Sequence, residues 1–335
     1  MYESASCAAS QIAAWPRWLG DIGGTNARFG WQDGPNDPVT DVHVLPCSEY
    51  PHLADAALAY LQRIGRTAPD SAAFGIANPV LGDAVQMTNH HWKFSVSDVR
   101  DRLGLKRLLF LNDFTALALA LPTLPSDALR QVGSGVAKAG MPMALIGAGT
   151  GLGVSGLIPL GYQDKWIPLS GEGGHVTLTA HNAREFEVIE LLRKRYGHVS
   201  TERAVCGQGL VDLYHALCDL KGAGGREITN AAQVLERAMA EPGSSANEAI
   251  DLFCGFLGSA AGDLALTIGS LGGVYIGGGI VPRLGQRFDA SPFRERFEAK
   301  GRFKTYLQEV PTWVIESPVS PALEGASRAL SLGIW

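Results

Sequence analysis

Short apolar runs that end in glycine or in polar residues recur along the chain, and this pattern predicts buried strands. The clearest run, at 108–111, is followed by Asn112 and Asp113 and then by a helix-favouring stretch at 116–121. Similar runs predict strands at 15–19, 29–31, 72–77, 143–146, 154–158, 272–282 (closing in a triple-glycine turn) and 312–315. Helical patterns predict helices at 53–64, 98–103, 184–196, 209–220, 231–240, 247–271, 293–303 and 321–332. Strands that alternate with helices in this way are typical of α/β proteins.

Two of the predicted strands enter glycine-rich turns and then return as strands. The first turn is Gly-Gly-Thr at 23–25, and the second is Gly-Thr-Gly at 149–151. Backbone N–H groups in such a turn, with a threonine hydroxyl, can surround an anion such as a phosphate. Most Gly-Gly pairs form only ordinary hairpins, which is the alternative here. Because the two turns share one design and lie about 125 residues apart, we expect a duplicated α/β unit with one copy in each lobe.

Two aspartates stand at the ends of predicted strands. Ligands of open α/β sheets bind beyond the carboxyl ends of the strands, so Asp113 is a candidate general base or metal ligand. Asp is also a favoured N-cap, and Asp113 could instead only cap the helix that follows. Asp21 comes just before the first glycine turn, where a carboxylate near phosphates would suit Mg²⁺.

Further polar residues are candidates for binding a polyol. Glu172 and His175 stand among glycines, so both side chains can point at a ligand. The same Glu-x-x-His spacing occurs on helices of di-metal bundles, but the flanking glycines argue against a helix here. Glu202 is another carboxylate, although a glutamate at the start of a helix is the simpler interpretation. The polar and aromatic segment 87–95, which contains Asn89, is suited to line the face of a sugar.

Composition restricts the class of protein further. The 335 residues predict two domains, and a net charge of −5 without a Lys/Arg-rich tract gives no indication of nucleic-acid or membrane-surface binding. The five cysteines are scattered without a C-x-x-C pair, which disfavours a zinc site or a disulfide framework and favours a reducing cytoplasm. The N-terminus has no basic region typical of a signal peptide. The weakly polar stretches at 146–162 and 258–282 are broken by glycines, so neither is a convincing membrane span.

Several well-known motifs are absent. The chain has no G-x-x-x-x-G-K-[ST] loop and no G-x-G-x-x-G fingerprint, which makes a nicotinamide-dependent enzyme an unfavourable interpretation. It also has no G-x-S-x-G elbow and no H-E-x-x-H pair, which weakens hydrolase interpretations. The remaining pattern indicates a two-lobed phosphate binder with an acidic, polyol-like pocket.

Six motifs, in one order along nearly the whole chain, resemble bacterial glucokinases, the group of the hexokinase–actin superfamily without a zinc-binding cysteine cluster. They are Gly-Asp-Ile-Gly-Gly-Thr-Asn-Ala-Arg (20–28), Met-Thr-Asn-His-His-Trp-Lys-Phe-Ser (87–95), Leu-Asn-Asp-Phe-Thr-Ala (111–116), Gly-Ala-Gly-Thr-Gly-Leu-Gly (147–153), Gly-Glu-Gly-Gly-His (171–175) and Gly-Gly-Val-Tyr-Ile-Gly-Gly-Gly-Ile-Val-Pro-Arg (272–283). The resemblance implies two RNase H-like (actin/hexokinase-like) α/β lobes around a central cleft. The small lobe would comprise 1–123 and 314–335, with 1–14 as a loose extension, and the large lobe would comprise 124–313.

The resemblance also implies an activity: ATP-dependent phosphorylation of D-glucose with Mg²⁺, in a cytoplasmic enzyme that forms a homodimer. Asp113 matches the catalytic base of the family. The sugar ligands would be Asn112, Glu172, His175, Glu202 and Asn89. The nucleotide contacts would be Gly20, Asp21, Ile22, Gly23, Gly24, Thr25, Gly149, Thr150, Gly151, Gly277 and Gly278, with Asp21 holding Mg²⁺ through water. Two alternatives stay open: a kinase for another hexose, such as mannose or fructose, and a non-catalytic sugar sensor, although a sensor would be expected to have lost the base.

Overall fold

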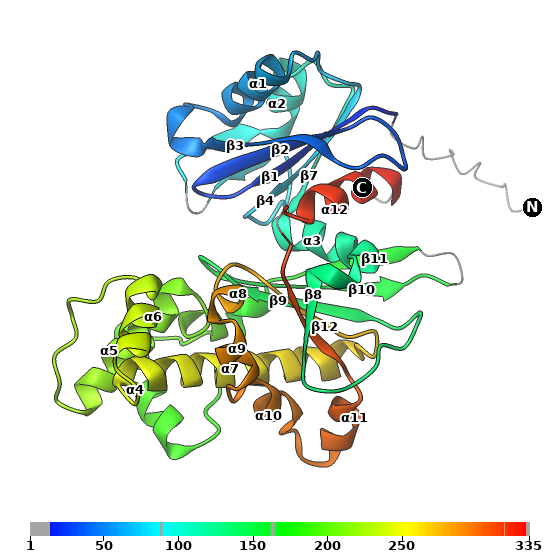
Figure 1. Cartoon of the computed structure of the whole chain (residues 1–335). Coiled ribbons are helices and arrows are strands. Elements are labelled where there is room, and N and C mark those ends of the chain that lie inside the picture. Colours follow the sequence, from blue (N-terminus) through cyan, green and yellow to red (C-terminus); the bar gives the residue numbers. More distant parts are fainter. Residues whose placement is uncertain (1–13, 88–89, 162–164, 318, 333–335) are drawn as a thin grey trace, which may run out of the picture. The chain divides into compact units, whose positions relative to one another are not determined.

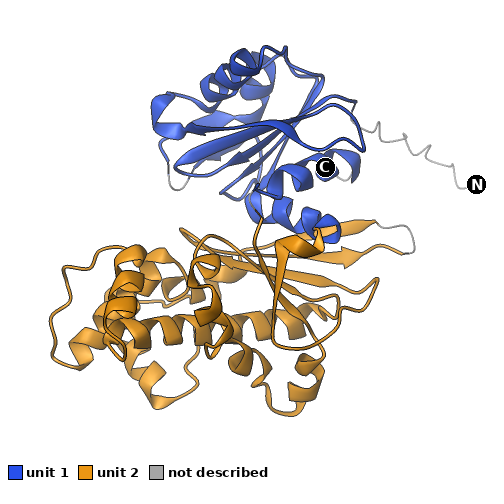
Figure 2. Cartoon of the chain, viewed as in Figure 1, with its two compact units in different colours: residues 1–124, 318–335 blue, residues 125–317 orange. Residues whose placement is uncertain are grey.

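The structure, a computed structural model, describes residues 14–87, 90–161, 165–317 and 319–332 (Figure 1). The chain divides into two compact units, Met1–Leu124 with Pro318–Trp335 as unit 1 and Pro125–Ser317 as unit 2 (Figure 2). A boundary at 313, as expected from the sequence, would cut strand β13 (Thr312–Ile315), which lies wholly in unit 2. All but the last residue of the predicted N-terminal extension lies outside the described residues.

Unit 1 contains a five-stranded mixed sheet in the order β3-β2-β1-β4-β7. β1 (Arg17–Ile22) is antiparallel to β2 (Asn26–Gln32), which is antiparallel to β3 (Thr40–Pro46). β4 (Ser71–Ile76) and β7 (Arg107–Asn112) continue the sheet parallel to β1. β4 is buried along its whole length, as expected for a parallel strand that is covered on both faces. The other elements are the hairpin β5 (Ala84–Gln86) and β6 (Lys93–Ser95), and the helices α1 (Leu53–Ile64), α2 (Val96–Arg102), α3 (Asp113–Ala120) and α12 (Ala322–Leu332).

The C-terminal helix α12 packs on the first strand and on α3 of the same unit. Arg17 of β1 is buried, and its Nη1 donates to the carbonyl oxygen and the hydroxyl of Ser327, at 2.6 and 3.0 Å. At Gly325 a Cβ would overlap the carbonyl oxygen of Ala116, so α12 and α3 cross with their backbones in contact. Close backbone packing at Gly325 and the buried side chain of Arg17 therefore attach the C-terminal helix to unit 1.

Unit 2 contains a six-stranded sheet in the order β11-β10-β9-β12-β13-β8. β9 (Met143–Ala148), β10 (Leu152–Pro159) and β11 (Trp166–Ser170) are successively antiparallel, and β12 (Val274–Gly277) and β13 follow parallel to β9. β8 (Leu129–Val132) adds an antiparallel edge. Three antiparallel strands followed by parallel ones is also the order in unit 1, which confirms the predicted duplicated α/β class. The helices are α4 (Ala183–Tyr196), α5 (Gly207–Leu220), α6 (Ala231–Ala240), α7 (Ser245–Ile268), α8 (Val281–Leu284), α9 (Gln286–Asp289), α10 (Phe293–Glu298) and α11 (Lys304–Gln308).

Helix α7 is the longest helix of unit 2 and forms much of its core. Phe253, Phe256 and Leu257 are fully or almost fully buried in one apolar cluster with side chains of the sheet. Among the described residues, α7 is the one helix long and apolar enough to cross a membrane, and most of it is buried inside unit 2. A core helix has the same composition, so this length of apolar sequence is explained by packing.

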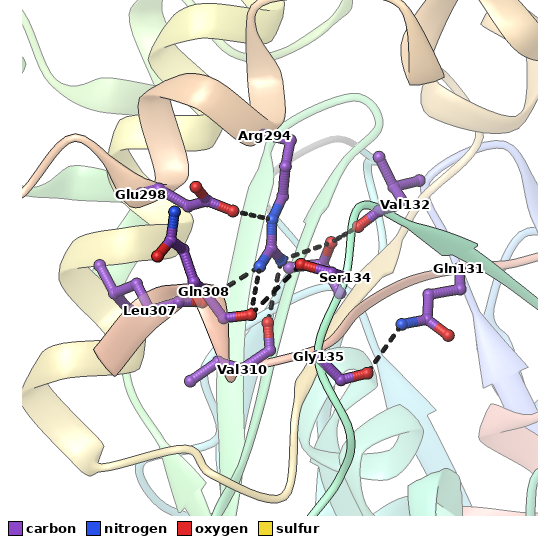
Figure 3. Close-up of polar contacts among 10 residues, drawn as sticks. Gln131, Val132, Ser134, Gly135, Arg294, Glu298, Leu307, Gln308 and Val310 are labelled. Carbon is purple, nitrogen blue, oxygen red and sulfur yellow. Dashed lines mark hydrogen bonds and ion pairs between the residues drawn. The ribbon is translucent and has the colours of Figure 1, made fainter. Parts of the chain in front are cut away.

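Arg294 of α10 holds the segment between α11 and β13 (Figure 3). Its guanidinium donates to the carbonyl oxygens of Leu307 (3.1 Å) and Val310 (2.9 Å), and its Nε pairs with Glu298 at 2.7 Å. The arginine side chain is only 12% exposed. The carbonyl of Leu307 also accepts from Val310 N at 3.1 Å, so Arg294 adds hydrogen bonds to those that the backbone makes at the end of α11.

Candidate active site

The first glycine turn joins β1 to β2 in unit 1. Gly23 N donates to the carbonyl oxygen of Asn26 over 2.9 Å, and the carbonyl oxygen of Thr25 accepts from Cys47 N at 2.8 Å. Thr25 itself is exposed and Gly24 is half-buried. The turn is thus fixed by its own backbone and by Cys47, the residue that follows β3, and Thr25 is left exposed at its tip.

Two residues predicted to contact the nucleotide lie deeper in the same strand. Gly20 and Ile22 are both buried in β1. A Cβ at Gly20 would lie 2.6 Å from the ring of Phe74, so this glycine admits a core aromatic side chain. A packing role therefore accounts for Gly20, and its part in nucleotide binding stays a prediction.

Asp21 pairs with Arg28 across the hairpin. The two residues are direct partners in the β1–β2 register, and Arg28 Nη1 donates to Asp21 Oδ2 at 2.9 Å. Their side chains are 18% and 34% exposed, so the pair stands at a partly open edge beside the turn. An anionic ligand at the turn would meet both a hard carboxylate oxygen and a guanidinium.

Asn112 and Asp113 stand at the carboxyl end of β7, on the same edge of the sheet as the first glycine turn. The strand register aligns Ile22 with Ile76 and Ile76 with Asn112. Asn112 is the N-cap of α3, since its Oδ1 accepts from the backbone N–H of Phe114 (2.9 Å) and of Thr115 (3.2 Å). The suggestion that Asp113 caps this helix is wrong in detail, because Asp113 is its first residue.

Because Asn112 and Asp113 make different hydrogen bonds, their side chains can act on a ligand in different ways. Asn112 uses its carbonyl oxygen as the cap, which leaves the amide nitrogen as the group that can donate to a ligand. Asp113 Oδ1 accepts from Phe114 N at 2.9 Å, and the carboxylate lies at the positive end of α3. An ionised carboxylate at this position is a group that can accept a proton.

The second glycine turn joins β9 to β10 in unit 2. Gly149 N donates to Gly151 O, and Gly149 O accepts from Gly207 N, both at 2.9 Å. Gly207 is the first residue of α5, so the N-terminus of that helix touches the turn. Cys206 caps α5, with its Sγ accepting from Gly209 N at 3.3 Å, and burial raises the pKa of the Cys206 thiol. A protonated thiol at this position adds no negative charge to the start of the helix.

Glu172, His175 and Glu202, here called the Glu–His–Glu cluster, lie together beside the second glycine turn. His175 Nδ1 is 3.9 Å from Glu172 Oε2, and its Nε2 is 3.7 Å from Glu202 Oε1. Glu202 Oε2 accepts from Leu152 N at 2.9 Å. The side chains of Glu172 and His175 are 56% and 61% exposed, so the cluster offers accessible acceptors and a donor. His175 ends a single 3-10 turn, Gly173–His175, and Glu202 lies in another, so neither is on an α-helix.

The third glycine-rich loop runs directly beside the second turn. Gly277 pairs with Gly147 in the sheet, and a Cβ at Gly147 would lie 2.5 Å from the carbonyl carbon of Gly277. Gly278 has φ +83°, and a Cβ there would overlap the carbonyl oxygen of Ala148. Only glycine fits at 147 and 278, so the backbone of this loop lies directly against the end of β9.

The fifth predicted sugar ligand, Asn89, lies outside the described residues. In the same motif, Trp92 is buried and its Nε1 donates to the carbonyl oxygen of Tyr50 at 3.0 Å. The tryptophan of this segment is therefore a packing residue of unit 1.

The residues present are compatible with Mg²⁺ held mainly by a ligand. The described part of the chain contains no group of three or more His, Cys, Asp or Glu side chains that could hold a metal ion. Mg²⁺ usually keeps several waters and binds through one or two carboxylates and substrate phosphates, so a dedicated cage is not required. Asp21, already paired with Arg28, fits such an indirect contact.

Sequence reasoning missed three groups of this site. Arg28 was part of a motif, but its pairing with Asp21 follows only from the hairpin register. Leu152 takes part through its backbone N–H, which no residue type can signal. Gly207 begins a helix beside the turn, and the Gly-Gln-Gly run at 207–209 was the available signal.

Duplicated α/β units, each with a glycine–threonine turn and carboxylates near the strand ends, define a phosphotransferase of the actin-like ATPase class. A family model described as Glucokinase matches residues 18–332. The chain is 54% identical to a glucokinase of Aromatoleum aromaticum over 94% of this chain and 95% of that protein, and 50% identical to a glucokinase of Chromobacterium violaceum over 95% and 90%. The crystal structure of a glucokinase from an Antarctic psychrotroph superposes with a TM-score of 0.84 at 34% identity, covering 95% of this chain and 99% of that one. The chain belongs to the glucokinase family of ATP-dependent hexose kinases.

Proposed function

We propose that this enzyme transfers the γ-phosphoryl group of ATP to the 6-hydroxyl of D-glucose, giving glucose 6-phosphate and ADP, with Asp113 as the general base. The observation that carries this proposal is the position of Asp113. It is the first residue of a helix at the carboxyl end of β7, on the sheet edge that also bears the first glycine turn. The class of substrate is inferred from the glucokinases to which nearly the whole chain is similar.

The chemistry explains why one carboxylate is central. A sugar hydroxyl is a weak nucleophile, so a base must accept its proton as the bond to phosphorus forms. Phosphoryl transfer otherwise requires mainly alignment and neutralisation of charge. The carboxylate of Asp113, at the start of α3, would meet the first requirement.

Asn112 and the Glu–His–Glu cluster would bind the sugar, together with Asn89. They offer an amide donor, two carboxylate acceptors and an imidazole, which suits several neighbouring hydroxyls. A polar site of this kind rejects an analogue that lacks one hydroxyl much better than an apolar pocket does, because its own groups are then left unpaired. That residues of both units act on one sugar is part of the proposal.

The two glycine turns and the loop at 277–278 would bind the nucleotide. Backbone N–H groups of the turns and the N-terminus of α5 would hold phosphate oxygens, and Arg28 would add positive charge. Mg²⁺, held through water by Asp21 and by the phosphates, would neutralise the charge of the transferred group.

The decisive experiment compares Asp113→Asn with Asp101→Asn, a matched control on the exposed surface of unit 1. Asp113→Asn should lower kcat by about 100-fold or more, the effect expected for loss of a general base, while the Kd for glucose changes little. The side chain of Asp101 is 66% exposed on α2 and, within the described part of the chain, pairs with its neighbour Arg100 alone, so its variant should match the wild type. A kcat close to normal in Asp113→Asn would remove Asp113 from the proposed role.

A survey of sugars tests the substrate. The kcat/KM for glucose should exceed the values for mannose and fructose, and a higher value for either would make the enzyme a kinase for that hexose. Failure to form any sugar phosphate, with glucose still bound, would favour a sugar sensor.

We also propose that the enzyme works in the cytoplasm as a homodimer. Cys47, Cys206, Cys218 and Cys254 are all free thiols in the described part of the chain, which suits a reducing compartment. The dimer is an expectation from the family, and light scattering of the purified enzyme tests it directly.

A further inference from the structure

The carboxylate of Glu202 contacts two parts of unit 2 that the proposed function assigns to different substrates. Its Oε2 accepts from Leu152 N at 2.9 Å, and Leu152 is the residue that directly follows the second glycine turn. Its Oε1 lies 3.7 Å from His175 Nε2, on the sugar-binding side. With 28% of its side chain exposed, Glu202 is the least exposed member of the Glu–His–Glu cluster.

The second glycine turn is shaped to accept this carboxylate. A Cβ at Gly151 would lie 2.5 Å from Glu202 Oε2, which no side chain tolerates unless the carboxylate moves away. A Cβ at Gly149, at the other end of the same turn, would meet nothing within 4 Å. Alanine at 151 would therefore displace the Glu202 carboxylate, whereas the Cβ of alanine at 149 would meet no neighbour.

The turn is fixed at its two ends in different ways. At one end the carbonyl oxygen of Gly149 accepts from Gly207 N of α5, a backbone contact that a ligand cannot easily change. At the other end the N–H of Leu152 is held by the Glu202 side chain, whose rotamer a sugar hydroxyl can influence. Only the second contact links the turn to the Glu–His–Glu cluster.

We propose that Glu202 is a positioning residue for the nucleotide-binding turn as well as a sugar ligand, and that Gly151 is consequently a determinant of glucose affinity. A sugar hydroxyl that donates to Oε1 holds the carboxylate in place, so that Oε2 keeps Leu152 N and the turn in the arrangement that binds phosphate. By linkage, nucleotide bound at the turn strengthens glucose binding by the same factor. This inference rests on the proposed assignment of the two sites.

The first test measures glucose binding without any nucleotide. Gly151→Ala lies in the nucleotide turn, yet it should weaken the Kd for glucose by about 5-fold or more, the lower end of typical coupling between sites. Gly149→Ala, in the same turn but with open space around its Cβ, should leave that Kd unchanged. In a Glu202→Ala background, Gly151→Ala should have no further effect on glucose binding, because the carboxylate that it displaces is gone.

A second comparison remains informative even if Gly151→Ala does not fold. Glu202→Ala and His175→Ala each remove one sugar ligand, but only Glu202 contacts the turn. At saturating glucose, Glu202→Ala should raise the KM for ATP by about 5-fold or more, whereas His175→Ala should not. Equal effects of the two variants on the KM for ATP, a normal glucose Kd in folded Gly151→Ala, or additive effects in the double variant would each overturn the proposal. Turnover of glucose by the wild type is measured first, so that its absence refutes the proposed function and the variant results judge only the coupling.

Discussion

Asn112 shows how one side chain can serve the fold and the ligand through different atoms. Its Oδ1 caps α3, and its amide nitrogen is the group proposed to donate to a sugar. Asp is as good an N-cap as Asn, whereas Ala costs about 1 kcal/mol of stability. Asn112→Asp should therefore keep the free energy of unfolding near the wild-type value and still weaken glucose binding, because a donor becomes a second carboxylate beside Asp113.

Asn112→Ala is the control for that experiment, since it removes both the cap and the donor. It should lower the free energy of unfolding by about 1 kcal/mol and also weaken glucose binding. Urea denaturation and glucose titration of the two variants separate these effects. Normal glucose affinity in Asn112→Asp would mean that the amide nitrogen takes no part in binding sugar.

Asp21 gives a prediction about the metal. Asp21→Asn removes the carboxylate that is expected to hold Mg²⁺ through water. Loss of a residue that holds a metal indirectly typically weakens metal affinity by about 10-fold or more. The Mg²⁺ concentration for half-maximal rate should rise by about that factor, with the glucose Kd unchanged.

Asp33→Asn is the matched control for Asp21. Asp33 follows the opposite end of β2 and likewise pairs with an arginine, Arg66, at 2.7 Å. Its variant should keep the wild-type dependence on Mg²⁺. The same rise in both variants would show a general charge effect and would exclude a specific role for Asp21.

At the scale of elements, the Arg294 contacts in Figure 3 predict a purely structural defect. Arg294→Ala removes a charged donor from two backbone carbonyls and leaves Glu298 without its ion pair, with only 14% of the glutamate side chain exposed. Loss of hydrogen bonds from a charged, nearly buried donor should lower the free energy of unfolding by about 3 kcal/mol. The KM values of the folded variant should stay normal, because the segment lies outside the proposed site.

Arg302→Ala provides the comparison for Arg294. Among the described residues, the Arg302 guanidinium has one recorded partner, the ring of Phe303, 5.4 Å from the ring centroid on the exposed surface of unit 2. Its removal should change stability by no more than about 0.5 kcal/mol. Similar melting temperatures for the two variants would contradict the role given to Arg294.

The sequence predicted the elements whose signals are local. The helix at 53–64 was predicted with its observed bounds because it has a clear apolar face and ends at Gly65, which has φ +66°. The helix expected at 293–303 is wrong as a single element. α10 ends at Glu298, and Gly301, with φ +57°, opens a separate 3-10 turn.

Three strands at the edges of the two large sheets were missed. β8 is a four-residue strand whose stability comes from pairing with β13, about 180 residues later in the chain. β3 and β11 are edge strands with mixed polar and apolar residues, so they lack the continuous apolar run that predicts a buried strand. Local patterns cannot reveal such pairing, because its energy arises from the tertiary fold.

The candidate site also combines residues that the sequence indicates with contacts that depend on the tertiary fold. The second glycine turn and the Glu–His–Glu cluster were recognised from residue types, and the structure brings them together within unit 2. The contact from Leu152 N to Glu202 depends on a backbone group and on loop packing. Sequence reasoning could name Glu202, but not its second contact.

At the scale of the whole molecule, the two units have separate hydrophobic cores. One core contains only residues of unit 1, around Trp18 and Phe74, and the other contains only residues of unit 2, around Phe253 and Phe256. Each unit also contains buried thiol or phenol groups, and burial disfavours the ionised form of these groups. Burial raises the pKa of Cys47 in unit 1 to about 11, and in unit 2 it raises the pKa of Cys254 and of Tyr275 to about 12 each.

These shifts predict loss of stability in alkali. An unfolded cysteine releases its proton near its ordinary pKa of 9.0, whereas buried Cys254 keeps its proton up to a pKa of about 12. Between these values the unfolded chain binds fewer protons than the native one, so the free energy of unfolding falls as pH rises. It should be unaffected by these groups below pH 9 and decrease from there toward pH 12, as measured by urea denaturation at several pH values.

Cys254→Ala isolates one contribution to this slope. The thiol is completely buried within α7, so its removal leaves a small cavity. The loss of packing at this cavity lowers the free energy of unfolding by about the same amount at every pH. The difference in free energy of unfolding between the wild type and Cys254→Ala should become smaller above pH 9. In that range only the wild type releases a proton from residue 254 when it unfolds, so only the wild type loses this stability as pH rises. A constant difference up to pH 11 would show that Cys254 ionises as readily in the native protein as in the unfolded chain, and the alkaline sensitivity of unit 2 would then have to arise from its tyrosines.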